Sequence, residues 1–259
     1  MHNAAILLAG GSGSRMRGSV KDKVLESLMG LPVILHSFGA FLESGEVGEV
    51  VFVCRDDVQA ANIKDGIKKF FDSAADKIEI RYTRGGAERQ DSVLNGLREI
   101  SDKSGLVFIH DGARPLAGVE NVKKLGRAAE ADGAAVLAAK VTDTIKRIPD
   151  GADARKCKLE DMDRSRLWAM QTPQVFKTSE ILSAYEGIKK SGARITDDVA
   201  AAVSKGIGVT VVENMYPNPK ITVPEDIAFI EFLNEKLPSK EAVAKCVLKA
   251  QKSASKGKK

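Results

Sequence analysis

Short apolar runs alternate with amphipathic helical patterns along most of this chain, and this alternation constrains the fold more than any other feature. Strands are predicted over residues 4–9, 50–54, 78–82, 106–110, 134–141 and 209–212. Helices are predicted over residues 32–43, 58–71, 88–100, 119–131, 179–190, 197–204 and 224–237. Strands that alternate with helices indicate a mostly parallel, twisted, Rossmann-like sheet with helices on both faces. We therefore expect an α/β fold whose ligand lies beyond the carboxyl ends of the strands.

A polar segment over residues 143–166 interrupts this alternation. Its centre, Pro149-Asp150-Gly151, is a turn signal between two stretches of extended character, residues 144–148 and 156–163. The pattern predicts a β-hairpin arm that leaves the sheet. Because an isolated hairpin is only marginally stable, we expect the arm to pack on a second subunit. We interpret residues 1–237 as one domain that includes the arm.

The positive charge of the chain is concentrated near its C-terminal end. The formal net charge is +5. Residues 238–259 contain seven lysines and one glutamate, so this tail contributes +6 and the other 237 residues contribute −1. No aromatic side chain lies between these lysines, which disfavours a nucleic-acid-binding arm. We expect a partly helical or disordered tail and no nucleic acid partner.

Hydrophobic patterning and cysteine content favour a cytoplasmic protein. No apolar run has the length of a membrane span, so we expect no membrane association. The first predicted strand begins at Ala4, which leaves no room for a signal peptide. Cys54, Cys157 and Cys246 are too few and too widely spaced for a disulfide framework or a zinc site.

The first predicted strand leads directly into a glycine-rich loop that carries cationic side chains. Residues 8–16 are Leu-Ala-Gly-Gly-Ser-Gly-Ser-Arg-Met, and Lys21 and Lys23 follow. Glycines let backbone N–H groups approach a ligand, while arginine and lysine bind phosphate oxygens. The loop lacks the third glycine of a dinucleotide fingerprint and the Gly-Lys-Ser/Thr of a P-loop. A nucleoside triphosphate site is the favoured interpretation, and a tight turn with solvated charges is the alternative.

Two more polar segments coincide with predicted strand ends or helix starts. Residues 84–93, Arg-Gly-Gly-Ala-Glu-Arg-Gln-Asp-Ser-Val, fit either a base or ribose contact through Ser92 or a plain capped helix. Residues 110–115, His-Asp-Gly-Ala-Arg-Pro, fit either a substrate-hydroxyl or metal site at Asp111 or a local pair between Asp111 and Arg114. We interpret His110 as a structural hydrogen-bonding residue.

Three later features have ordinary structural interpretations when each is taken alone. Residues 171–174, Gln-Thr-Pro-Gln, are typical of a stiff polar turn. Thr196 and Asp197 form a good helix N-cap. Lys220, just before the last predicted helix, has the character of a surface charge.

Taken together, and in the order in which they occur along the chain, these segments resemble the 2-C-methyl-D-erythritol 4-phosphate cytidylyltransferase family. The resemblance extends over about residues 4–232 and also includes Asp143-Thr144, Asp198 and Ile221-Thr222. It implies a nucleotidyltransferase fold of the glycosyltransferase-A type. It also implies the conversion of CTP and methylerythritol phosphate to CDP-methylerythritol and pyrophosphate, with Mg²⁺ bound mainly through the CTP phosphates. In-line attack of the substrate phosphate on the α-phosphorus depends on positioning and charge neutralisation.

The resemblance implies a role for each matched residue and a homodimer in which the arm serves the partner's site. Arg15 and Lys23 are the expected catalytic cations at the triphosphate, and Lys220 is the one at the substrate phosphate. The expected nucleotide contacts are Ala9, Gly10, Gly11, Gly13, Gly86 and Ser92. The expected substrate contacts are Asp111, Arg114, Thr144, Arg164 and Thr172, of which Thr144 and Arg164 belong to the arm. No metal-binding side chain is implied.

This chain departs from the family pattern after Arg15. Where the family has Pro-Lys-Gln, residues 22–24 are Asp-Lys-Val, and the loop is one residue longer, so Lys21 competes with Lys23 for the role of catalytic lysine. Asp22 adds a negative charge that weakens triphosphate binding unless it pairs with a lysine or faces water.

Three alternative functions follow from the same residues. An enzyme for another polyol phosphate, such as ribitol 5-phosphate, shares the fold and the nucleotide site. A nucleotide-dependent oxidoreductase is disfavoured by the incomplete dinucleotide fingerprint. A catalytically silent nucleotide-binding protein is disfavoured by the presence of Arg15, Asp111 and Lys220.

Overall fold

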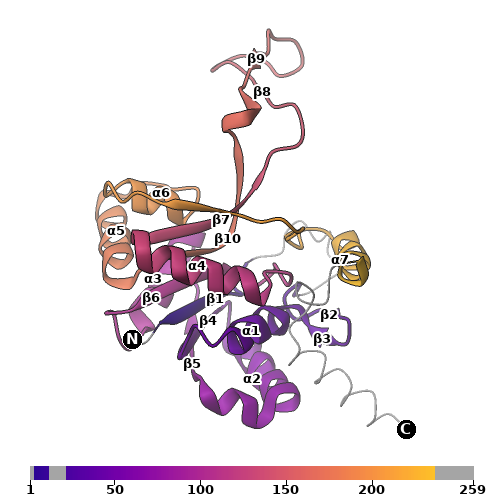
Figure 1. The fold of residues 1–259 in the computed structure, drawn as a ribbon, viewed down its shortest axis with the longest axis vertical. Coiled ribbons are helices and arrows are strands. Elements are labelled where there is room, and N and C mark those ends of the chain that lie inside the picture. Colours follow the sequence, from indigo (N-terminus) through magenta and orange to yellow (C-terminus); the bar gives the residue numbers. More distant parts are fainter. Residues whose placement is uncertain (1–2, 12–21, 237–259) are drawn as a thin grey trace.

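The computed structural model describes residues 3–11 and 22–236 and arranges them around a seven-stranded sheet (Figure 1). The strand order is β11-β7-β10-β6-β1-β4-β5. The strands are β1 (Ala4–Leu8), β4 (Glu49–Cys54), β5 (Glu79–Arg84), β6 (Leu106–Asp111), β7 (Ala134–Lys140), β10 (Trp168–Lys177) and β11 (Thr210–Glu213). Within this sheet β10 runs antiparallel to both of its neighbours, β6 and β7, and the other pairings are parallel. The predicted mostly parallel α/β sheet is confirmed.

Helices cover both faces of the sheet, as the alternating pattern predicts. The first face carries α1 (Val33–Ser44), α2 (Asp57–Phe71) and α4 (Val119–Asp132), and α7 (Glu225–Lys236) adds Ile230 to the same core. The second face carries α3 (Arg89–Glu99), α5 (Thr178–Ser191) and α6 (Asp198–Val203). Two short 3-10 helices, η2 (Asp72–Lys77) and η3 (Arg164–Arg166), lie in connections. The predicted helices and strands of these layers end within one or two residues of the observed bounds.

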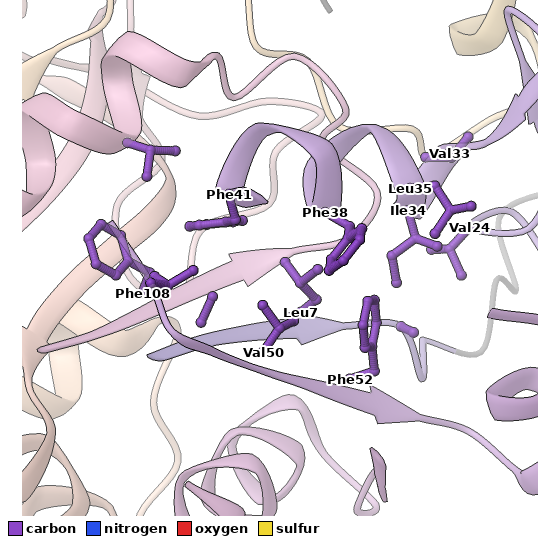
Figure 2. Packing of buried hydrophobic residues seen from close by; sticks show 14 of the residues in the cluster. Leu7, Val24, Val33, Ile34, Leu35, Phe38, Phe41, Val50, Phe52 and Phe108 are labelled. Atoms are coloured by element: carbon purple, nitrogen blue, oxygen red, sulfur yellow. The ribbon is translucent and has the colours of Figure 1, made fainter. Parts of the chain in front are cut away.

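The first core fixes the strand ends that build the site. Successive side chains of β1 point to opposite faces, so Leu7 joins this core and Ile6 joins the other. Figure 2 shows Phe38 and Phe41 of α1 packed over the strands; the ring centroids of Phe38 and Phe52 lie 5.8 Å apart, as do those of Phe41 and Phe108. Each such buried side chain contributes roughly 1.5–3 kcal/mol. This packing holds β1, β4 and β6 in register beneath the site.

The polar turn predicted over residues 171–174 is wrong, because these residues lie inside strand β10. The Thr172–Pro173 peptide is cis, and the pairing of β10 with β7 shifts register between Met170 and Gln174. Proline has no N–H to donate to a ladder, so the strand is irregular at this point. The irregularity and the polar side chains conceal the alternation of a strand. The small antiparallel pair β2 (Ser27–Leu28) and β3 (Leu31–Pro32) is also absent from the predicted elements.

The predicted hairpin arm is present and extends away from the body of the molecule (Figure 1). Its strands β8 (Lys146–Arg147) and β9 (Glu160–Asp161) pair antiparallel. The predicted basic tail from residue 238 onward lies outside the described residues, as do Gly13, Arg15 and Lys21. No helix within residues 3–11 and 22–236 combines the length and apolar character needed to cross a bilayer.

Candidate active site

A cavity of about 490 Å³ opens at the carboxyl ends of β1 and β6. In the sheet β1 lies between β4 and β6, so the chain first adds strands on one side of β1 and then on the other. Ligands of open α/β sheets bind at such a point. The lining comes from six separate stretches of the chain: residues 8–11; Lys23 and Val24; Arg55; residues 86–89 with Ser92; Asp111 and Ala113; and Lys220 and Thr222.

The turn after β1 offers backbone to the cavity. The N–H groups of Ala9 and Gly10 both donate to the Val53 carbonyl, at 2.9 and 3.1 Å. A Cβ on Gly10 would lie 3.4 Å from the Arg55 nitrogen, whereas a Cβ on Gly11 would meet no atom within 4 Å. Gly10 therefore allows close packing on β4, and Gly11 leaves room for a ligand.

The second glycine loop is shaped by Ser92. The Ser92 hydroxyl accepts from the Gly86 N–H at 3.0 Å and donates to the Glu88 carbonyl at 3.2 Å. A Cβ on Gly86 would lie 2.3 Å from the Cβ of Asp91, so a larger residue would displace the start of α3. Glu88 and Asp91 cap α3 reciprocally. Ser92 thus holds one wall of the cavity in place through local bonds.

Asp111 forms the charged floor of the cavity. Its Oδ2 lies 2.7 Å from the Lys220 ammonium and 3.8 Å from the Arg114 Nε, and its Oδ1 lies 3.4 Å from the Arg89 Nε. Burial alone raises the pKa of this carboxyl, but Arg89 and Lys220 outweigh burial and hold the pKa well below its usual range. Asp111 is therefore an ionised group among three cations.

Thr172 and Arg114 lie behind Asp111 and are not among the residues that line the cavity. The buried Thr172 hydroxyl accepts from the Asp111 N–H at 3.1 Å and donates to His110 Nδ1 at 3.0 Å. His110 Nε2 donates to the Arg114 carbonyl at 3.1 Å, and burial lowers the His110 pKa to about 4, which keeps the ring neutral. Arg114 donates to the Asn218 carbonyl at 2.6 Å. His110 is the structural hydrogen-bonding residue that the sequence predicts.

Two lysines from distant parts of the chain face the same cavity. Lys23 donates to the carbonyl of Ile221 at 3.0 Å, one residue beyond Lys220. The contact brings the end of the first loop against the segment that precedes α7. Since Lys21 lies outside the described residues, the choice between Lys21 and Lys23 stays a prediction.

The charge of Asp22 is compensated inside the protein. Its Oδ2 accepts from the Gln59 amide at 2.6 Å and lies 3.3 Å from the Arg55 guanidinium. Gln59 is itself buried and also donates to the Ala9 carbonyl at 3.3 Å. The expected lysine or water partner is therefore replaced by an arginine and a buried glutamine, which tie the first loop to α2.

The sequence analysis includes Arg89 and Asp198 only as members of longer segments and assigns them no role of their own. It does not identify Tyr185 at all. Arg89 donates two hydrogen bonds of 2.8 Å to Asp198, and the Tyr185 hydroxyl donates to the same carboxylate. Asp197 caps α6 by accepting from the Ala200 N–H at 2.9 Å, as predicted. A second aspartate beside a cap, at the start of an apolar helix, is the one sequence signal that points to this pair.

Thr144 and Arg164 are not brought to the cavity of their own chain. Both are exposed on the arm, where Arg164 donates to the Thr142 carbonyl at 2.6 Å. The arm extends away from the sheet that carries the cavity (Figure 1). Their predicted substrate contacts require a second subunit.

Comparisons with known proteins agree over nearly the whole described chain. The model of a family described as 2-C-methyl-D-erythritol 4-phosphate cytidylyltransferase matches residues 3–236. The chloroplastic enzyme of that name from Oryza sativa subsp. japonica is 40% identical over 236 residues, which cover 90% of this chain and 75% of the relative. The Bacillus velezensis protein of that name is 38% identical over 233 residues, covering 89% and 95%.

A solved structure shows the same arrangement in three dimensions. The 4-diphosphocytidyl-2C-methyl-D-erythritol synthase of Anaerococcus prevotii superposes with a TM-score of 0.74 at 31% sequence identity, covering 88% of this chain and 95% of that one. The Francisella tularensis protein described as a 2-C-methyl-D-erythritol 4-phosphate cytidylyltransferase gives a TM-score of 0.71 at 22% identity, covering 90% and 100%. The second likeness bears on the fold alone.

Proposed function

The chain belongs to the 2-C-methyl-D-erythritol 4-phosphate cytidylyltransferase family, and from that premise we propose how its cavity carries out the reaction. The protein is a nucleotidyltransferase that converts CTP and methylerythritol phosphate to CDP-methylerythritol and pyrophosphate in non-mevalonate isoprenoid biosynthesis. Another polyol phosphate is not favoured. The roles of individual residues, the metal, the dimer and the cytoplasmic location are our proposals.

The chemistry sets what the residues must supply. A phosphate oxygen of methylerythritol phosphate forms a bond to the α-phosphorus of CTP. The bond from that phosphorus to the oxygen bridging it to the β-phosphorus breaks, and pyrophosphate leaves with the electron pair. Negative charge gathers on the α-phosphoryl oxygens and on the leaving group, so catalysis depends on fixed cations and alignment.

CTP occupies the part of the cavity between the two glycine loops. The backbone around Ala9, Gly10 and Gly11 faces the Gly86 wall, which Ser92 holds. We infer that backbone groups of these two loops contact the cytosine and exclude a larger purine. The triphosphate then extends toward Lys23, with Gly13 and Arg15 as further ligands on the basis of the sequence pattern. These cations neutralise charge at the α-phosphorus and on pyrophosphate.

Methylerythritol phosphate occupies the floor beside Asp111. The ionised Asp111 carboxylate accepts hydrogen bonds from the polyol hydroxyls, and Arg114 and Thr172 fix its position from behind. Lys220 has three N–H donors, of which the 2.7 Å bond to Asp111 uses one. The Lys220 ammonium can thus bind the substrate phosphate while it remains attached to Asp111. This ion pair, which lines the same cavity as Lys23, is the observation that carries the assignment.

Mg²⁺ fits this site as an ion that is bound by the phosphates of the nucleotide. Among the described residues, no group of three or more His, Cys, Asp or Glu side chains is placed to hold a metal ion. Of the two carboxylates that line the cavity, Asp111 is already bonded to cations, and Glu88 caps the start of α3. Mg²⁺ commonly keeps several waters and binds substrate phosphates. The ion supplies charge neutralisation at the phosphates, and the protein contributes Arg15 and Lys23 beside it.

A homodimer completes the site through the arm. Ile145, Ile148 and Leu159 on the arm are 38%, 44% and 50% exposed, which is apolar surface for a partner to cover. In such a dimer, Thr144 and Arg164 of one chain contact the substrate in the other chain's cavity. We place this dimer in the cytoplasm, as the cysteine content indicates.

The role of Asp111 is tested by pyrophosphate release with CTP, Mg²⁺ and either methylerythritol phosphate or ribitol 5-phosphate. Asp111→Asn removes a charged hydrogen-bond acceptor, so the KM for methylerythritol phosphate is expected to rise about tenfold or more while the KM for CTP stays within about twofold. Asp65→Asn, the same change at an exposed position on α2, is the control. An unchanged KM for methylerythritol phosphate in Asp111→Asn contradicts the assignment.

The trans role of the arm is tested by mixing two defective chains. Asp111→Asn and Arg164→Ala chains are co-expressed with different tags, and the heterodimer is isolated. If the arm serves the partner, one site of the heterodimer has both residues intact, and activity returns to about half that of the wild-type dimer. If Arg164 acts in its own chain, both sites stay defective and activity does not return.

A further inference from the structure

A chain of ionic contacts links the cavity floor to helices on the second face of the sheet, and the proposed mechanism does not use it. Arg89 at the start of α3 bonds Asp198 of α6 through both terminal nitrogens, while its Nε lies 3.4 Å from Asp111. Asp198 is fully buried and also accepts the hydroxyl of Tyr185 from α5. One guanidinium thus connects a structural carboxylate with the carboxylate of the site.

The bidentate contact fixes the orientation of Arg89. A guanidinium is planar and rigid, so two parallel bonds to one carboxylate set its plane and the direction of the Nε–H bond. Rotation would leave the charge of Asp198 without its charged partner in the interior, which is strongly unfavourable. Tyr185 adds a third hydrogen bond to Asp198 and holds that carboxylate in turn.

This orientation decides how strongly Arg89 engages Asp111. The 3.4 Å contact from Arg89 to Asp111 is longer than the 2.7 Å bond from Lys220. Arg89 therefore attracts and orients the Asp111 carboxylate, while the Oδ1 atom can still accept a hydrogen bond from a ligand. A guanidinium released from Asp198 would turn toward Asp111 as the nearest carboxylate. It would then occupy the acceptor positions that polyol hydroxyls need.

We propose that Arg89, held by Asp198 and Tyr185, is a positioning residue that keeps the Asp111 carboxylate aligned and available for the polyol phosphate. The proposal rests on the role of Asp111 proposed above. It predicts a selective effect: the KM for the polyol phosphate depends on this chain of residues, and the KM for CTP does not.

Two mild variants and one matched control test the proposal by steady-state kinetics. Arg89→Lys keeps the charge but loses the bidentate geometry, and we expect a rise of about tenfold in the KM for methylerythritol phosphate with the KM for CTP within about twofold. Tyr185→Phe keeps the ring and removes one hydrogen bond from Asp198, and we expect a rise of about threefold in the same KM. The control is Arg98→Lys. Arg98 also bridges α3 to α5, through two bonds of 3.0 and 3.1 Å to Glu186, but is exposed and lies outside the cavity lining.

The outcomes separate the two proposals. A KM for CTP that rises in parallel with that for methylerythritol phosphate, in both variants, overturns the positioning role and indicates a general structural one. If Arg89→Lys does not fold, Tyr185→Phe decides alone, and an unchanged KM for methylerythritol phosphate rejects the inference. If Asp111→Asn raises that KM but Tyr185→Phe and Arg89→Lys do not, the positioning role fails and the role of Asp111 stands. If Asp111→Asn leaves it unchanged, both fail.

Discussion

The cavity floor and the arm each contain a pair of an arginine and a carboxylate, in different surroundings. At the floor, Arg89 bonds the fully buried Asp198 at 2.8 Å. On the arm, Arg147 bonds Glu160 at 2.7 Å, and these side chains are 66% and 42% exposed. The distances are similar, yet water reaches both side chains of the arm pair, whereas Asp198 in the floor pair is 0% exposed.

The difference shows which pairs fix the geometry of the molecule. A buried charge has no water to replace a lost partner, so each partner becomes obligatory and its direction is set. An exposed pair is in competition with water and salt, and it loses side-chain entropy when it forms. Floor pairs therefore define the shape of the site, whereas the arm must draw its stability from other contacts, including its exposed apolar side chains if a second subunit covers them.

The largest expected effect comes from breaking the buried pair. Asp198→Ala removes a fully buried carboxylate, so that Arg89 loses its bidentate partner and the buried Tyr185 hydroxyl loses its acceptor, and the free energy of unfolding should fall by about 3–5 kcal/mol in urea denaturation. Asp161→Ala, which removes the exposed partner of Lys146 on the arm, is the control and should cost less than about 1 kcal/mol. Equal losses in the two variants would remove the distinction between the floor and the arm.

The next largest effect is expected from removing the charge of Lys23, which lines the cavity. Lys23→Ala should lower kcat/KM by about 100- to 1000-fold, or roughly 3–4 kcal/mol of transition-state stabilisation, because Lys23 lines the cavity and is proposed to bind the CTP phosphates. The stability of the variant should change little, since the bond from Lys23 to the Ile221 carbonyl is only partly buried. The matched variant is Lys21→Ala. A larger loss of kcat/KM in Lys21→Ala would show that the alignment of the first loop is wrong.

The sequence predicts the regular parts of the fold and several of the residues that meet at the cavity. Short apolar runs locate six strands, because the central strands are buried on both faces, and helical periodicity locates seven helices. The glycine loops and Asp111 stand at strand ends, where ligands bind. Strand β10 is not predicted, because Pro173 and its polar neighbours interrupt the alternation of apolar and polar residues. The pairing of Asp198 is not predicted, because its partner Arg89 is 109 residues away in the sequence and no local pattern encodes a tertiary ion pair.

Acid should affect the body of the protein and not the arm. Burial lowers the pKa of His36 and of His110 to about 4, whereas the unfolded chain has the usual value near 6.5. The native state therefore binds fewer protons below about pH 6.5, so stability is full above that pH and is lost as the pH falls toward 4. Each histidine contributes at most about 1.4 kcal/mol per pH unit.

A histidine variant measures this contribution directly. His36→Gln removes one of the two buried imidazoles, so the slope of unfolding free energy against pH between 6.5 and 4.5 should become about half as steep. Urea denaturation at several pH values gives the slope. An unchanged slope in His36→Gln would mean that carboxylates, and not the buried histidines, govern the acid response of the body.

The smallest effect is expected from the exposed pair on the arm. Arg147→Gln should reduce the free energy of unfolding by less than about 1 kcal/mol, and the difference should shrink further at high salt because exposed charges are screened. Urea denaturation at two salt concentrations and two protein concentrations checks both points. A loss that grows with protein concentration would contradict the exposure of this pair and would place Arg147 and Glu160 inside the subunit interface. The pair would then be desolvated by the partner chain, and it would obey the same rules as Arg89 and Asp198.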